Sequence, residues 1–346
     1  MNRLIDVHSH VTPFSFPAAP DAAAAERWPC MHCRPDGGAT INIGNAPFRE
    51  LDSRSWDGDR RTDDMDADGV AIQVLSPMPE LLSYWLQTPS ATTLCECSNH
   101  QIADLISKYP DRFRGLGTVP LQDIPATIAE LGRLKSVFGL SGVEIGSNIN
   151  GAMPGEPQFD PFWEAAEALE LAVFVHALHP VAAKAITPPP FYVPFALFPV
   201  DVAMAAASIL LAGITERFPR LRIGFSHGGG ALGAILGRLD SGWHHTEGYG
   251  QKISQLPSVS AQRLFYDSNV YDAKYLKYLA EVAFPGKVFT GTDYPYQIMQ
   301  KDPADFVRTA QLDRLALESL TAGAAGTFLA EDFSHLVRPP TGSGMA

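Results

Sequence analysis

The sequence predicts an α/β protein in which eight parallel β-strands, with helices between them, close into a distorted (β/α)8 TIM barrel. Short runs of apolar and β-branched residues recur eight times along the chain, and helical stretches separate most of them. Most runs are continuously apolar, which is typical of parallel strands buried on both faces. A chain of 346 residues could form two domains, but α/β barrels often reach this length as one. We therefore expect a single barrel domain over residues 1–335.

The expected strands are short and are spaced widely enough for a helix to fit between most neighbours. Most are rich in Val, Ile, Leu or Phe, residue types that pack well in buried sheets. In chain order they are Leu4–His8, Val70–Ser76, Phe113–Val119, Gly142–Gly146, Ala172–His176, Arg222–Ser226, Leu264–Asn269 and Lys287–Thr292.

The segments between the strands carry helix signals. Two of them end just before Pro110 and Pro219, and proline cannot continue a helix. The last is followed by Phe284-Pro285-Gly286, which is a turn sequence. The expected helices are Asp59–Asp68, Ser90–Lys108, Ile124–Val137, Pro161–Leu169, Asp201–Phe218 and Ala273–Ala283.

Two long insertions interrupt this alternation. Residues 12–57, after the first strand, are rich in Pro, Gly and Ala, and Val181–Pro199, after the fifth strand, contains three consecutive prolines. Both follow the carboxyl end of a strand, where a barrel of this type keeps its active site. We expect both to form lids or pocket walls, and residues 336–346 to be a disordered tail.

The charge balance limits the partners of the chain. A net charge of −12 disfavours nucleic acid, because phosphate binding needs clustered Lys and Arg side chains. A small anionic substrate remains compatible, since local arginines can override the global charge. The chain starts without a secretory leader, and its longest apolar stretch, Val202–Ile214, is too short to span a bilayer. We expect a cytoplasmic protein with no membrane partner.

Four cysteines are present, and Cys30 and Cys33 form a C-x-x-C pair. A second pair at zinc-finger spacing is missing, since the other two are the C-x-C residues Cys95 and Cys97. We interpret all four as reduced thiols, and a role for the Cys30–Cys33 segment stays open.

The most informative motif is His8-Ser9-His10, at the end of the first expected strand. Side chains at i and i+2 of a strand point the same way, so both imidazoles can bind one metal ion. His176 and Asp293 follow later strands, and strand ends in a barrel converge on one pocket. Three imidazoles and a carboxylate suit Zn²⁺, with Mn²⁺ or another divalent ion as alternatives.

His227 and Asp293 are the expected catalytic residues. The proposed ligand set leaves a coordination position for water, whose pKa Zn²⁺ lowers to about 7. Asp293 could orient or deprotonate this water in addition to binding the metal. His227 opens the sequence Ser226-His227-Gly228-Gly229-Gly230 and could act as a general acid or base, or as a further ligand.

Five other residues are expected to bind a small carboxylate substrate. Arg49, in the first insertion, and Arg238 can bind a carboxylate through paired hydrogen bonds. Trp85, Phe195 and Tyr294 are candidate walls of the pocket, although most aromatic residues of a barrel belong to its core.

A series of further motifs surrounds these residues, and in combination they resemble the amidohydrolase-superfamily decarboxylases. The group most similar to the chain is the aminocarboxymuconate-semialdehyde decarboxylases. The resemblance covers about residues 3–330 and rests on Ile5-Asp6-Val7-His8-Ser9-His10, Trp56-Asp57, Met65-Asp66, Gly69-Val70, Gln73-Val74-Leu75-Ser76, Ser83-Tyr84-Trp85, Phe113–Pro120, Phe174-Val175-His176, Phe218–Leu221, Ser226–Gly230 and Gly291-Thr292-Asp293-Tyr294-Pro295.

The resemblance implies a zinc-dependent decarboxylase that needs no O₂ and is usually a homodimer. It implies that His227 activates the metal-bound water and that Arg49 holds the substrate. Arg238 matches an arginine that reaches the active site of the neighbouring subunit. The zinc ligands of the family match His8, His10, His176 and Asp293.

The chain departs from this family in the expected pocket. Glu144, at the end of the fourth strand, stands where a Gln is typical, and Phe195 stands where the family carries a Trp. A carboxylate at Glu144 could bind metal or repel a substrate carboxylate. The alternatives to an aminocarboxymuconate semialdehyde are therefore a hydroxylated aromatic or pyridine carboxylate, or hydrolysis of an amide or lactone by the same metal site.

Overall fold

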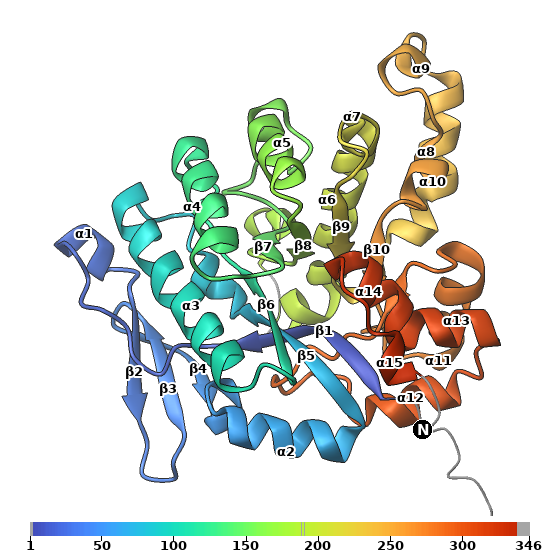
Figure 1. The fold of residues 1–346 in the computed structure, drawn as a ribbon. Coiled ribbons are helices and arrows are strands. Elements are labelled where there is room, and N and C mark those ends of the chain that lie inside the picture. The colour runs from blue at the N-terminus through green and yellow to red at the C-terminus, as the bar shows by residue number, and fades with distance from the viewer. Residues whose placement is uncertain (1–2, 188, 190, 338–346) are drawn as a thin grey trace, which may run out of the picture.

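A parallel eight-stranded barrel forms the centre of the protein (Figure 1). The computed structural model describes residues 3–187, 189 and 191–337. The strands, in their order around the barrel, are β1 (Leu4–Val11), β5 (Val70–Pro77), β6 (Phe113–Gly117), β7 (Gly142–Gly146), β8 (Ala172–His176), β9 (Arg222–Phe225), β10 (Phe265–Asp267) and β11 (Val288–Phe289).

Backbone hydrogen bonds in both directions join the last strand region to the first. The Val7 amide donates to the Thr290 carbonyl (2.8 Å), and the His10 amide donates to the Tyr294 carbonyl (2.7 Å). Every residue of β1 and of β5 is buried, which explains why these runs are mostly apolar. The predicted barrel is confirmed, with each expected strand at its place in the chain.

The helices lie around the outside of the barrel (Figure 1). The expected helix Asp201–Phe218 is divided in two, because Gly213 adopts a left-handed conformation (φ 68°). The helices are α1 (Ala22–Ala25), α2 (Gly58–Asp68), α3 (Thr88–Lys108), α4 (Ile124–Ser136), α5 (Asp160–Ala168), α6 (Phe198–Leu211), α7 (Ile214–Arg217), α8 (Leu232–His245), α9 (Tyr249–Lys252), α10 (Pro257–Ala261), α11 (Ala273–Tyr278), α12 (Pro303–Thr309), α13 (Arg314–Glu318), α14 (Ala324–Leu329) and α15 (Ser334–Val337).

The first insertion forms a small antiparallel sheet, which the sequence analysis did not identify. Its strands are β2 (Pro29–Cys33), β3 (Ala39–Ile43) and β4 (Ala46–Leu51). Ile41 and Leu51 of this sheet pack in one apolar cluster with Met78 and Leu81, which follow β5. This packing attaches the sheet beside the carboxyl end of the barrel and carries Arg49, on β4, toward that end.

The second insertion leads into a long apolar helical stretch, Val193–Leu211, whose mean hydropathy is 1.9. By length and composition it could cross a membrane, and 44% of it is buried within the protein. Its residue Asp201 is buried and accepts hydrogen bonds from the Ser147 hydroxyl and, at 3.0 Å, from the Asn148 amide. Because Ser147 and Asn148 directly follow β7, these hydrogen bonds attach the apolar helix to the barrel. Pro188 and Pro190 lie outside the described residues.

One helical region and the chain end complete the described structure. The helices α8 and α9 project away from it at the upper right (Figure 1). At the chain end, Leu336 and Val337 belong to α15, and the rest of the expected tail lies outside the described residues.

Candidate metal centre

Four side chains from three parts of the barrel converge at its carboxyl end. They are His8 and His10 on β1, His176 at the end of β8, and Asp293 after β11, and we call them the metal cluster. All four are buried, and one ligand atom from each lies within 4.8 Å of the others. The Nε2 atoms of His8 and His10 are 3.1 Å apart, and Asp293 Oδ1 lies 3.4 Å and 3.2 Å from them.

The second nitrogen of each imidazole faces an acceptor. His8 Nδ1 lies 2.5 Å from Asp267 Oδ2, and His10 Nδ1 lies 3.0 Å from the Pro77 carbonyl. His176 Nδ1 lies 2.8 Å from the Ala177 carbonyl. Because these acceptors carry no hydrogen, each Nδ1 is a protonated donor, and each Nε2 is the atom that can bind a metal once it carries no proton.

The buried ligand atom His176 Nε2 has no hydrogen-bond partner among the described residues. Buried Asp293 Oδ1 faces the Nε2 atoms of His8 and His10 without a well-aligned hydrogen bond. A buried polar atom without a partner costs free energy, so such atoms require an explanation. A divalent cation bound by the cluster would satisfy both, and the donor set therefore fits Zn²⁺ or Mn²⁺.

The electrostatics of the cluster also favour a cation. Burial lowers the pKa of His10 to about 4 and holds the pKa of His176 well below its usual value. Burial also opposes charge on His8, but the carboxylates of Asp293 and Asp267 raise its pKa to about 10. Burial would raise the pKa of Asp293, yet His8 and His10 hold it well below its usual range. Without a metal, a protonated His8 thus compensates the negative charge of the buried carboxylates.

Asp267, on β10, is a functional residue that the sequence analysis missed. Its Oδ2 holds His8, and its Oδ1 accepts from the amides of Gly228 (2.7 Å) and Asn269 (3.1 Å). Gly291 permits this close packing, because a Cβ there would lie 2.7 Å from the Cβ of Asp267 and 2.8 Å from that of His8. One carboxylate therefore fixes both a metal-cluster imidazole and the loop that begins at His227.

His227 lies beside the metal cluster. Its ring centroid is 5.6 Å from that of His8 and 5.3 Å from that of His176. Burial lowers the pKa of His227, which favours a neutral imidazole that can accept a proton. The position is compatible with the predicted catalytic role, which stays a prediction.

Arg49 approaches the cluster through one aromatic ring. Its guanidinium carbon lies 4.2 Å from the centroid of the Tyr296 ring, which in turn stacks on His10 at 5.1 Å. The buried hydroxyl of Tyr296 has no hydrogen-bond partner among the described residues, and the contacts given for the Arg49 guanidinium are with the rings of Tyr296 and Phe48. This arrangement places a cation near the cluster, together with a phenol that the sequence analysis did not single out.

Comparison with known proteins assigns the chain to a family, since its sequence matches the amidohydrolase family over residues 5–325. The chain belongs to the amidohydrolase family. This amidohydrolase is 32% identical over 331 residues to 2-amino-3-carboxymuconate-6-semialdehyde decarboxylase of Dictyostelium discoideum, which covers 95% of the chain and 92% of that relative. These matches confirm the predicted resemblance, and with it the prediction of an enzyme.

Solved structures share the fold of this amidohydrolase. The 5-carboxyvanillate decarboxylase LigW from Sphingomonas paucimobilis has a TM-score of 0.80 and 26% identity, and the match covers 96% of this chain and 100% of that one. A dihydroxybenzoic acid decarboxylase from Polaromonas sp. JS666, solved with manganese and 2-nitroresorcinol, has a TM-score of 0.75 and 20% identity, with 95% and 97% covered.

The other predicted substrate residues of the amidohydrolase lie in different settings. Trp85 stacks on His179 at 4.7 Å, and Tyr294 is buried, with its hydroxyl donating to Asp64. Phe195 is 62% exposed and stacks on Phe191. Arg238 is exposed on the projecting helix α8. Their predicted roles stay predictions.

Arg61 supports the cluster from outside and was also missed. Its fully buried guanidinium donates to the carbonyls of His10 and Arg54, both at 2.8 Å, and to the Gln73 side chain at 2.7 Å. These bonds fix the end of β1 against α2 and β5. Its position on the charged helix α2 gave no sign of this role.

Glu144, on β7, is buried next to the cluster. Its Oε2 lies 3.7 Å from His10 Nδ1, and neither of its oxygens has a hydrogen-bond partner among the described residues. Burial raises the pKa of Glu144 to about 8. This carboxyl group is the part of the site that the proposed metal ligation leaves unexplained.

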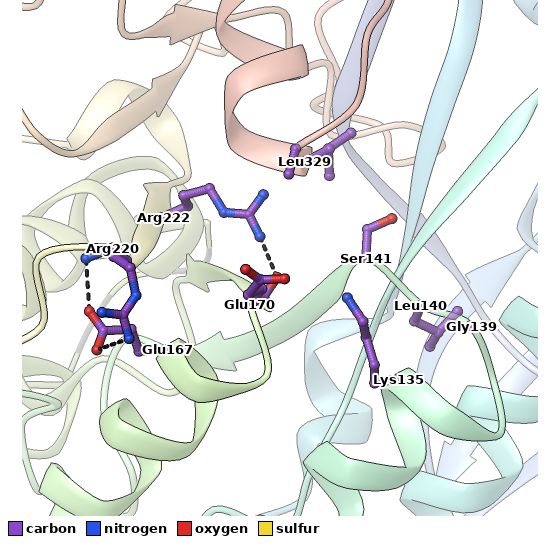
Figure 2. A pocket seen from close by; sticks show the side chains of 10 residues that line it. Lys135, Gly139, Leu140, Ser141, Glu167, Glu170, Arg220, Arg222 and Leu329 are labelled. Carbon is purple, nitrogen blue, oxygen red and sulfur yellow. Dashed lines mark hydrogen bonds and ion pairs between the residues drawn. The ribbon is translucent and has the colours of Figure 1, made fainter.

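A separate cavity of about 460 Å³ lies at the opposite end of the barrel (Figure 2). It is lined by Ser141 and Arg222, which stand at the start of β7 and β9, away from the carboxyl ends. Arg220 pairs with Glu167 at 3.1 Å, and Arg222 donates to a backbone carbonyl. The amino end of a barrel serves stability, so the metal cluster remains the candidate site.

Proposed function

We propose that this amidohydrolase is a metal-dependent decarboxylase that removes CO₂ from a small carboxylate without an oxidant. The observation that carries the proposal is the metal cluster, in which three oriented imidazole lone pairs and one carboxylate oxygen face a common point. The cation of Arg49 nearby supports a carboxylate substrate. We propose Zn²⁺ as the resident ion, with Mn²⁺ as the alternative.

The substrate we propose is an aminocarboxymuconate semialdehyde or a closely related ring-cleavage product. The 32% identity to the Dictyostelium decarboxylase over 95% of the chain supports this choice. The alternative is a hydroxylated aromatic or pyridine carboxylate, which the similarity to 5-carboxyvanillate decarboxylase supports. Decarboxylation of either substrate class requires the protein to orient the carboxylate and to transfer a proton.

The residues of the chain supply orientation and proton transfer. Decarboxylation breaks the bond to the carboxyl carbon, and the electron pair left on the substrate carbon takes up a proton. The bound ion, when present, would activate water and stabilise negative charge on the substrate. His227 holds and transfers the proton, and Arg49 keeps the carboxylate in one orientation.

We also propose a homodimer in which Arg238 completes the neighbouring active site, and a cytoplasmic location. Arg238 is exposed on α8, which projects from the barrel, so a second subunit can receive it (Figure 1). Sedimentation of the purified protein tests the dimer. Arg238→Ala should raise KM without changing the metal content, and a monomer with full activity would refute the proposal.

The test of function measures CO₂ release by zinc-loaded protein from freshly generated aminocarboxymuconate semialdehyde, with the loss of substrate absorbance followed in parallel. His227→Ala should retain the metal and lose about 10²–10⁴-fold in turnover, the usual contribution of general acid–base catalysis. Unchanged turnover would refute the role of His227. Incorporation of water into the product without CO₂ would instead indicate a hydrolase.

A further inference from the structure

Glu144 differs from the other carboxyl groups buried in the barrel. Asp6 accepts hydrogen bonds from the side chains of Gln73 (3.0 Å) and Thr292 (2.7 Å), and Asp267 accepts from His8 and from two backbone amides. Glu144 is fully buried, and both of its oxygens lack such a partner among the described residues. A buried carboxyl group of this kind either stays neutral or ionises beside a cation, and a dication in the metal cluster would supply that cation.

The place of Glu144 in the barrel indicates what that partner is. It lies on β7 two residues before Gly146, which is in register with His176 on β8. Its Oε2 is 3.7 Å from the imidazole of His10. The side chain thus lies beside His10 of the metal cluster, and neither of its oxygens makes a hydrogen bond within the described residues.

We propose that Glu144 is a part of the metal centre and that its carboxylate strengthens the binding of a divalent cation by His8, His10, His176 and Asp293. A second carboxylate increases the attraction for a dication in a site that excludes water. The nearby Ser76 hydroxyl offers Glu144 one neutral donor, which cannot balance a buried negative charge, so a cation is the stronger counterpart. The inference rests on the metal dependence proposed above.

The experiment compares Mn²⁺ binding by stripped wild-type protein and by Glu144→Gln, with free Mn²⁺ measured by electron paramagnetic resonance. We expect one ion per wild-type chain and an affinity at least about tenfold lower in Glu144→Gln, as for other groups that support metal ligands. The control is Glu130→Gln, which removes a buried carboxylate that is already paired with Asn99 and Arg133. Its Mn²⁺ affinity should stay within twofold.

A second readout separates this role from simple packing. Stripped Glu144→Gln should melt at or above the temperature of the stripped wild type, because an unpaired buried carboxyl group is gone, and Mn²⁺ should raise its Tm by less. Glu144→Asp keeps the carboxylate and should bind Mn²⁺ more tightly than Glu144→Gln. If the Gln variant folds poorly, the Asp variant can be compared with wild type instead.

Several results would overturn the inference. An affinity of Glu144→Gln within twofold of wild type would show that the carboxylate does not act on the cation. Tighter binding of benzoate to Glu144→Gln with unchanged Mn²⁺ affinity would place Glu144 on the substrate side instead. Wild-type protein that binds neither Mn²⁺ nor Zn²⁺ would refute the proposed metal-dependent function itself, so the two failures are distinguishable.

Discussion

Replacing Asp267 by Asn should weaken metal binding and destabilise the fold at the same time. Asp267 accepts three hydrogen bonds, from His8 Nδ1 on one oxygen and from the amides of Gly228 and Asn269 on the other. Asn has one acceptor oxygen, so its NH₂ group must face either His8 or the two backbone amides. At least one buried donor then loses its acceptor.

The expected magnitude follows from these contacts. A buried donor left without an acceptor costs about 1–3 kcal/mol of stability. Loss of the group that orients a metal-bound imidazole typically costs about 10–100-fold in metal affinity, which is about 1.4–2.7 kcal/mol. Both effects arise from one substitution, because the same carboxylate holds His8 and the loop that starts at His227.

Two assays measure these effects on Asp267→Asn. Urea denaturation of the stripped protein gives the free energy of unfolding, and competition with a chromophoric chelator gives the Zn²⁺ affinity. The matched control is Asp272→Asn, which changes an exposed N-cap of α11 that Asn can replace with little loss. If Asp267→Asn binds Zn²⁺ within twofold of wild type, our account of His8 orientation is wrong.

Three further predictions concern the groups that support or surround the cluster. Arg61→Met should cost at least about 1–3 kcal/mol in urea unfolding, because it leaves buried acceptors unpaired, and a cost below about 1 kcal/mol would contradict this. Gly291→Ala should lower the Zn²⁺ affinity by forcing Asp267 and His8 apart, whereas Gly132→Ala, with open space around it, should not. Alkylation followed by mass spectrometry should label exposed Cys30 in the native protein but Cys95 only after unfolding, because burial raises the pKa of the Cys95 thiol; labelling of both at one rate would refute it.

The metal cluster was predictable from the sequence because one rule of barrel geometry applies to all its members. His8, His10, His176 and Asp293 each lie at or just after the carboxyl end of a buried parallel strand, and these ends meet at one face. Apolar runs identify the strands in the sequence. The polar residues at the ends of these strands could therefore be predicted to lie together, without knowledge of any distance.

The supporting residues were not predictable in this way. Asp267 lies within an expected strand, and its role depends on the register that brings β10 beside His8. The β2–β3–β4 sheet escaped notice because its strands are half exposed and carry cysteine, proline and charged residues among few apolar ones. Tyr296 lies in a loop, where the direction of a side chain follows from local backbone geometry rather than from a periodic pattern.

The closure of the barrel has a consequence for how the protein is made. β1 supplies two of the proposed ligands, and it is joined to the segment after β11 that carries the fourth. During synthesis the two β1 histidines leave the ribosome first, but they meet Asp293 only after the eighth strand has emerged. Metal capture by the proposed site would thus be a late event that links the two ends of the barrel, and a nascent chain halted before β11 would expose histidines without their carboxylate.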